Sequence, residues 1–508
     1  MTRKSFPSTS VLRAASAALI VVAASACSHD LTGLNNNPNS PTNAPPGPLF
    51  TNAVQSLVGR FRGANFDFTG TSLFAQHLAK VQYVDEDQYN LRTTTTASHF
   101  ASPYTGGLED LQKIIKGATA TQANTSGPAS VMKDWSFQIM TDTWGDIPYS
   151  QALKGDSVGG SLTPAYDPQK DIYAGMMADL TKVATSMTDA ATSTDPGLGG
   201  SDPIYSGNPA KWRKFANSLH ARMALRLYKV DPATANTQLQ AALSAPGGIM
   251  MSNADNAQLV WPGDGVYDNP WAANFATRDD DRMSKTLVDT LNALHDKRLT
   301  VYAQPTQADP TKYAGMPNGL STSAAGSYFN TASRPGAIFY PGVTVYGTFG
   351  TAAGKKTPSY LMVYSELAFI QAEAAERGIG GLSAGQAAGF YNAGVRASFD
   401  QWGLSVADAN AYLATPGVAY APGANGLNQI GLQKWIALYT QGSEAWAGYR
   451  RTGNPASLTP GPAAILTQIP RRIPYSVDEQ SVNAISRAAA VARQGPDNFL
   501  TRVYWDKP

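Results

Sequence analysis

The sequence is poor in cysteine, histidine and charged side chains. One cysteine among 508 residues leaves no partner for an intramolecular disulfide bond. Lysine, arginine, aspartate and glutamate make up 15% of the chain, against about 25% in an average soluble domain. The formal net charge is +2, and balanced charge argues against nucleic acid as a partner.

Catalytic and metal-binding motifs are also scarce. The five histidines stand apart from one another, without the spacing of a zinc site. GLSAG, 381–385, matches a nucleophile motif, but it follows a predicted helix instead of a strand, so Ser383 is interpreted as a helix cap. RDDDR, 278–282, either binds a cation or pairs its own charges, and the second interpretation is favoured. We therefore predict no catalytic residue, no metal site and no cofactor.

One enzyme class stays open as an alternative. Glycoside hydrolysis uses two carboxylates that come from distant positions and leave no local motif. A glycoside hydrolase attached to the cell surface is therefore retained beside the non-catalytic interpretations.

The N-terminus has the pattern of an export signal. Arg3 and Lys4 supply positive charge, and residues 14–26, AASAALIVVAASA, are apolar apart from two serines. Thirteen helical residues span about 20 Å, which is too short for a hydrocarbon core of about 30 Å. A charged start, a short apolar run and small residues at its end predict a signal peptide over residues 1–26.

Cys27 follows this signal directly. Ala-Ser-Ala-Cys resembles a bacterial lipobox, in which the cysteine is acylated, although Ala24 stands where leucine is usual. The alternative is cleavage after Ala26, which leaves a free thiol. Several acyl chains anchor a protein stably to a membrane, and Ser28 in place of aspartate favours the outer membrane by resemblance to proteobacterial lipoproteins. Acylation would leave no cysteine for catalysis, metal binding or disulfides.

A flexible segment then leads into one large folded region. Residues 27–48 are rich in asparagine and proline, which predicts an extended tether, and residues 49–508 are predicted to form a single domain. Apolar residues at steps of three and four predict helices. These helices are expected at 108–118, 131–144, 168–190, 211–232, 283–294, 365–378 and 433–455.

Local signals mark some helix ends. Asn208 and Pro209 suit a cap and first turn, Ser365 is expected to cap the helix over 365–378, and Gly378 is expected to end it. Strand signals are few, and 336–349 is the best candidate for a short hairpin. The sequence therefore predicts a mainly helical, all-α protein with long irregular loops and at most a few short strands.

Several blocks along the chain resemble the SusD/RagB family of nutrient-binding outer-membrane lipoproteins, in particular its SusD-like branch. After the lipoprotein start and LNNNPNSPTNAPP come TDTWGDIPYSQAL (141–153), the three helical segments at 211–232, 365–378 and 433–455, IPRRIPYSVDEQSVN (469–483) and RVYWD (502–506). Ser476 stands where the family usually has proline. The blocks follow the family's order from Cys27 to Asp506.

The resemblance implies a fold of tetratricopeptide-like helix pairs and partnership with a SusC-like TonB-dependent transporter. It also implies capture of a nutrient, an oligosaccharide or a peptide, without chemical change, at the outer membrane with the protein facing the cell exterior. The residues after Cys27 lack the acidic run of some surface-exported relatives. A helical-repeat scaffold for other envelope proteins remains a further alternative.

Two loop segments carry the residue types that suit a sugar or peptide ligand. Aromatic residues and planar polar side chains on loops present flat apolar faces beside hydrogen-bonding groups. The segments 82–90 and 260–282 supply the candidates: Tyr83, Asp85, Tyr89, Asn90, Trp261, Tyr267, Asn269, Trp271 and Arg278. The alternative is that these aromatic residues hold the loops to the helical core.

The segment 433–455 is interpreted as internal bracing. Helical spacing puts Trp435, Leu438, Gly442 and Trp446 on one face, which predicts burial of both tryptophans. Glu444 and the arginine pair at 450–451 are expected to form ion pairs with neighbouring helices.

Overall fold

A computed structural model describes residues 44–63, 66–155, 157, 159–339 and 352–508. The folded unit runs from Pro46 to Pro508, so the first helix begins inside the segment 27–48 that was predicted as a tether. No helix in these ranges is both long enough and apolar enough to cross a membrane.

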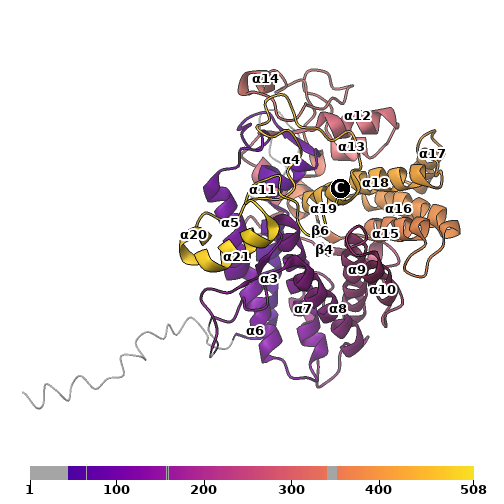
Figure 1. Ribbon diagram of the computed structural model, residues 1–508. Helices are drawn as coiled ribbons and strands as arrows, with labels where there is room; N and C mark the ends of the chain where they lie inside the picture. Colours follow the sequence, from indigo (N-terminus) through magenta and orange to yellow (C-terminus); the bar gives the residue numbers. More distant parts are fainter. Residues whose placement is uncertain (1–43, 64–65, 156, 158, 340–351) are drawn as a thin grey trace, which may run out of the picture. The chain divides into compact units, whose positions relative to one another are not determined.

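Helices dominate the folded unit, as predicted (Figure 1). The α-helices are α3 (Pro46–Phe61), α4 (Ser72–Phe74), α5 (Thr93–Pro103), α6 (Glu109–Gly117), α7 (Ala123–Trp144), α8 (Gln169–Ser186), α9 (Pro209–Arg226), α10 (Pro232–Leu243), α11 (Pro270–Phe275), α12 (Lys285–Ala293), α13 (Leu299–Tyr302), α14 (Thr322–Gly326), α15 (Tyr364–Arg377), α16 (Ala387–Gln401), α17 (Val406–Leu413), α18 (Ala424–Ala437), α19 (Gly442–Thr452), α20 (Glu479–Val482) and α21 (Ala484–Gln494). Short π-helical turns, η1 (Asp67–Thr71) and η2 (Tyr104–Leu108), and 3₁₀ turns, η3 (Gly199–Ser201), η4 (Asn253–Asp255), η5 (Ala337–Phe339), η6 (Ala352–Lys356) and η7 (Ala384–Gln386), connect them.

The described strands are short and form three two-stranded antiparallel sheets. β1 (Leu78–Lys80) pairs with β5 (Asp281–Met283), β2 (Ile147–Pro148) with β3 (Tyr166–Asp167), and β4 (Ala257–Leu259) with β6 (Ser359–Met362). Most of the hairpin predicted at 336–349 lies outside the described residues, and residues 337–339 form η5.

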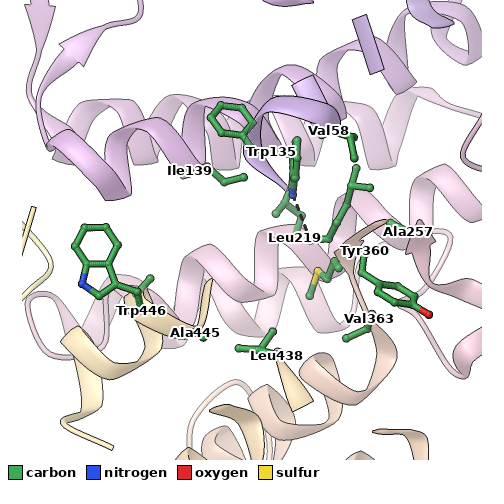
Figure 2. Packing of buried hydrophobic residues seen from close by; sticks show 14 of the residues in the cluster. Val58, Trp135, Ile139, Leu219, Ala257, Tyr360, Val363, Leu438, Ala445 and Trp446 are labelled. Carbon is green, nitrogen blue, oxygen red and sulfur yellow. Dashed lines mark hydrogen bonds between the residues drawn. The ribbon is translucent and has the colours of Figure 1, made fainter. Parts of the chain in front are cut away.

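Consecutive helices pack against one another in two groups. In the first group α6, α7, α8, α9 and α10 pack in series. In the second group α16 packs on α15 and α17, and α18 packs on α15 and α16 (Figure 1). α15 also packs on α9, which joins the two groups. Figure 2 shows Trp135 of α7, Leu219 of α9 and Ala445 of α19 turned toward one shared interior. The Trp135 indole donates to the Leu361 carbonyl over 3.2 Å, so its polar atom is satisfied.

Helix-end signals are partly confirmed. Asn208 caps α9 by accepting from the Lys211 amide, and Gly378 ends α15 in the left-handed region at φ 64°. Ser365 does not cap α15, because that helix begins one residue earlier with Val363 at the cap position. Ser383 opens the 3₁₀ turn η7, where its amide donates to the Gln386 side chain over 2.9 Å.

The single helix predicted over 433–455 is wrong, because the chain breaks at Thr440. Thr440 has φ of 70°, and the break separates α18, with Trp435, from α19, with Trp446. Both tryptophans are buried, as predicted, and each indole donates to a backbone carbonyl. The left-handed residue allows the two indoles to reach different parts of the core.

Ion pairs brace α19 from inside, as predicted. Glu444 contacts Arg226 of α9 at 2.5 Å, and Arg451 contacts Glu373 of α15 at 2.5 Å. Arg450, for which an ion pair was also expected, instead donates to the backbone carbonyls of Asp142 and Arg471. These groups are nearly inaccessible to solvent, so the interpretation of the segment 433–455 as structural is confirmed.

Candidate ligand-binding cavity

The pairing of β1 with β5 brings the two predicted loop segments together. The strands are antiparallel, with Lys80 opposite Asp281, and the Val81 amide donates to the Asp280 carbonyl over 2.8 Å. Residues that follow β1 therefore lie beside residues that precede β5. This register places Tyr83, from the segment 82–90, next to Arg278, from the segment 260–282.

A cavity of about 450 Å³ opens at this junction, a size typical of small-ligand sites. We call it the Tyr83 cavity. It is lined by Phe68, Thr69, Lys80, Tyr83, Glu86, Arg92, Asn274 and Arg278.

Tyr83 presents a flat apolar surface to solvent. Its side chain is 55% exposed, and the Arg278 guanidinium lies 5.1 Å from the ring centroid. Arg278 is held in turn by Asp280, at 2.5 Å. The backbone of Tyr83 is left-handed, with φ of 54°, a conformation that is uncommon for bulky residues. Tyr83 therefore lines the cavity with its ring beside the Arg278 guanidinium.

Polar groups surround this ring. Lys80 is paired with Asp281 at 2.9 Å, while burial raises the pKa of Glu86 and the cations Lys80 and Arg92 oppose that rise. Asn274 is half-buried. The cavity therefore offers amide and guanidinium donors together with a carboxylate acceptor beside an aromatic face, which suits a ligand with hydroxyl groups and an apolar C–H face.

Asp87 fixes the loop that carries Tyr83. Its carboxylate accepts from the Lys80 amide, the Asn318 side chain and the Gly319 amide, at 2.7–3.2 Å. Burial raises the pKa of Asp87 to about 6, against the opposing effect of these hydrogen bonds. The loop is therefore held by hydrogen bonds from Asp87 within it, as well as by the elements at its two ends.

The segment 278–282 pairs its own charges, as predicted. Asp279 contacts Arg282 at 2.9 Å and Arg334 at 2.6 Å. Arg278 and Asp280 pair with each other. In the described ranges no group of three or more histidine, cysteine, aspartate or glutamate side chains is arranged to hold a metal ion.

Four predicted site residues are buried in the core, which corrects their placement on the surface. Tyr89 is 0% exposed and packs on Phe74, and the Trp261 indole donates to the Ser359 hydroxyl over 2.9 Å. Asn269 caps α11 by accepting from the amides of Trp271 and Ala272. These side chains hold the loops to the core and do not face the Tyr83 cavity.

Trp271, the fourth, lies behind the cavity wall. It is 2% exposed and packs against Phe68, with ring centroids 4.7 Å apart, and against Phe339 at 4.9 Å. Phe68 lines the Tyr83 cavity. Trp271 therefore supports the wall and does not reach a ligand directly.

The remaining predicted residues are exposed but do not line this cavity. They are Asp85, Asn90 and Tyr267, of which Tyr267 is 44% exposed. Sequence reasoning missed the lining residues Phe68, Thr69, Lys80, Glu86, Arg92 and Asn274. Glu86 and Asn274 lie inside the two predicted segments, whereas Phe68 lies on η1, which no periodic pattern marks.

The fold is mainly helical, and the Tyr83 cavity is lined by residues of η1, β1 and α11 together with the loops that follow β1 and α11. The chain belongs to the SusD-like family, described as starch-binding and associating with the outer membrane, which matches residues 38–476. No curated protein sequence matches the chain.

Solved structures agree with this family. A chitin-binding protein has 27% identity and a TM-score of 0.78, over 91% of this chain and 100% of its own. A chitin-binding SusD homologue from Flavobacterium johnsoniae has 28% identity and a TM-score of 0.77, over 91% and 97%. A SusD homologue from Bacteroides uniformis has 26% identity and a TM-score of 0.75, over 91% and 99%. The resemblance inferred from the sequence blocks is confirmed.

Proposed function

We propose that the protein captures an oligosaccharide in the Tyr83 cavity and delivers it, chemically unchanged, to a SusC-like TonB-dependent transporter. Family membership supports a binding role at the outer membrane. Two similar structures are described as chitin-binding, and the family description names starch. Oligomers of these two glycans are therefore the first ligands to test.

The observation that carries the proposal is the meeting of Tyr83 and Arg278 in one cavity. Aromatic rings bind the C–H faces of pyranoses, because both surfaces are flat and apolar. The guanidinium of Arg278 and the amide of Asn274 then supply donors for sugar oxygens, and Glu86 supplies an acceptor for a hydroxyl.

Attachment to the membrane is the second part of the proposal. Cys27, acylated after removal of residues 1–26, would anchor the protein in the outer membrane with the folded unit facing the exterior. The lipobox-like sequence before Cys27 supports this. Cys27→Ser is expected to shift the protein from the membrane pellet to the soluble fraction, whereas an unchanged distribution would contradict lipid anchoring.

Titration calorimetry with purified protein tests the ligand site. We expect Tyr83→Ala to weaken binding of chitin or starch oligomers about tenfold, because loss of a stacked aromatic face costs roughly 1–1.5 kcal/mol. Tyr267→Ala is the matched control, since Tyr267 is also an exposed tyrosine on a loop but lies outside the cavity. Equal affinities for wild type and Tyr83→Ala, or equal losses in both variants, would contradict this site.

A further inference from the structure

A second cavity lies between α5, α6, α20 and the loop that follows β2. Its volume is about 550 Å³, larger than that of the Tyr83 cavity. In Figure 1, α20, at the yellow end of the colour scale, lies beside α5. We call it the Leu162 cavity, and none of its lining residues is shared with the Tyr83 cavity.

The walls of the Leu162 cavity are mostly apolar. They are formed by Phe100, Ala101, Tyr104, Pro148, Ala152, Leu153, Gly155, Leu162, Pro164 and Val482. Phe100 packs edge-on against Trp144, with centroids 5.3 Å apart, and the Tyr104 hydroxyl donates to the Pro148 carbonyl over 2.7 Å. These contacts fix both rings, so the cavity exists without a ligand.

The apolar surface continues outward past the cavity. Leu162 is 87% exposed, Val482 is 59% exposed, and Ile485 on the neighbouring helix α21 is 88% exposed. Leu162 and Val482 both line the cavity, whereas Ile485 does not. Large apolar side chains gathered around an apolar hollow mark a binding surface, because single exposed ones are common but clusters are not.

The polar groups of the Leu162 cavity are mainly acceptors. Glu479 accepts from the Tyr166 hydroxyl over 2.6 Å through one oxygen, and its other oxygen accepts no hydrogen bond from the described residues. The Asn483 amide nitrogen donates to the Pro164 carbonyl over 2.9 Å, which leaves its oxygen available. Glu109 lies 4.0 Å from Lys113. Among the described lining residues there is no lysine, arginine or histidine.

We propose that the Leu162 cavity is a second binding site, which takes a short peptide with an apolar side chain next to a lysine. Apolar walls fit an apolar side chain, and the carboxylates of Glu479 and Glu109 complement an ammonium group with its three donors. A neutral sugar fits less well, because most of the wall residues offer no polar side chain to its hydroxyl groups. The site is independent of the proposed oligosaccharide capture.

The test uses the purified folded protein and two synthetic peptides, acetyl-Leu-Phe-Lys-amide and acetyl-Leu-Phe-Glu-amide. Binding is followed by calorimetry or by ligand-observed NMR. We expect the lysine peptide to bind and the glutamate peptide to bind at least tenfold more weakly. No binding of the lysine peptide at millimolar concentration, or equal binding of both peptides, would overturn the proposal.

Three variants locate the site. Leu162→Ser is expected to weaken binding of the lysine peptide several-fold, and Val406→Ser, at an exposed apolar side chain of α17 outside the cavity, is expected to leave it unchanged. Glu479→Gln keeps an acceptor for Tyr166 and removes one charge, so a loss of about two- to fivefold is expected. Equal losses in the Leu162 and Val406 variants would overturn the placement.

A competition experiment separates this proposal from the first. Chitin and starch oligomers are expected not to displace the lysine peptide, and Tyr83→Ala is expected to bind the peptide like wild type. Displacement by the oligomers would show that the Leu162 cavity takes sugars and would overturn the peptide assignment. If the oligosaccharides fail to bind but the lysine peptide binds, only the proposal for the Tyr83 cavity is contradicted.

Discussion

The substitution Glu444→Gln probes the ion pairs that join α19 to the rest of the core. Glu444 is 3% exposed, and its carboxylate lies 2.5 Å from Arg226, 3.5 Å from Lys434 and 3.8 Å from Arg222. Burial by itself raises the pKa of Glu444, but these three cations outweigh burial and hold the pKa well below its usual value. Glu444 is therefore the common anion of three buried cations.

The expected cost follows from the charge left behind. Glutamine nearly keeps the shape of glutamate but removes the negative charge, and the nearest remaining carboxylate to Arg226, Asp142, is 3.8 Å away. Removing one partner of a buried pair typically lowers the free energy of unfolding by about 3–5 kcal/mol. For a unit of roughly 460 residues the entropy of unfolding is about 1 kcal/mol/K, so Tm is expected to fall by about 3–5 °C.

Thermal unfolding followed by circular dichroism at pH 7 measures this effect. The matched control is Asp289→Asn, which removes the anion of an exposed pair with Lys285, whose side chains are 53% and 54% exposed. Exposed pairs contribute about 0–1 kcal/mol, so the control is expected to shift Tm by about 1 °C or less. A Glu444→Gln variant that melts like the control, or above wild type, would refute the bracing role.

Three further predictions concern the same core and its caps. Trp271→Ala removes a buried indole from behind the Tyr83 cavity and is expected to lower the free energy of unfolding by about 3–5 kcal/mol, measured as a fall in Tm; no fall would contradict its placement in the core. Arg451 and Arg377 outweigh burial and lower the pKa of Glu373 to about 2, so its stabilisation is present above pH 4.5 and is lost as pH falls toward 2. Glu373→Gln is therefore expected to reduce the fall in Tm between pH 4.5 and pH 2, measured by thermal melts across this range. A fall in Tm equal to that of wild type would contradict the pairing. Gly378→Ala places a side chain at φ 64° with no neighbour within 4 Å, so backbone strain alone predicts a loss of about 1–2 kcal/mol, and a stabilised variant would contradict it.

Helix periodicity predicted the mainly helical class and segments that correspond to α6, α7, α8, α9, α12, α15 and α19, whereas α3, α5, α10, α16, α17 and α21 were not predicted. The predicted helix at 108–118 corresponds to α6, and that at 283–294 to α12, because each buries apolar residues at helical spacing: Leu111 and Ile114 in α6, and Leu287, Val288 and Leu291 in α12. The break at Thr440 had no such signal, since the residues on both sides keep a helical pattern. Tertiary packing of two tryptophans in different places outweighs local periodicity there.

Loop composition located the two segments of the candidate site but not the orientation of their side chains. Tyr83 and Trp271 are both large aromatic residues on loops or at short helices, yet one is 55% exposed and the other 2%. Their difference depends on the register of β1 with β5 and on the ring of Phe68, which lies far from Trp271 in the sequence. Such contacts carry no signal in the local sequence.

Co-purification from gently solubilised membranes tests the central claim most directly. The protein is captured through a C-terminal tag in the presence of a chitin or starch oligomer, and both the bound proteins and the oligomer are identified by mass spectrometry. We predict a TonB-dependent barrel in equal amount together with an oligomer of unchanged length. Recovery of the protein alone or with other envelope proteins, or a shortened oligomer, would contradict capture and delivery and would favour a scaffold or a hydrolase.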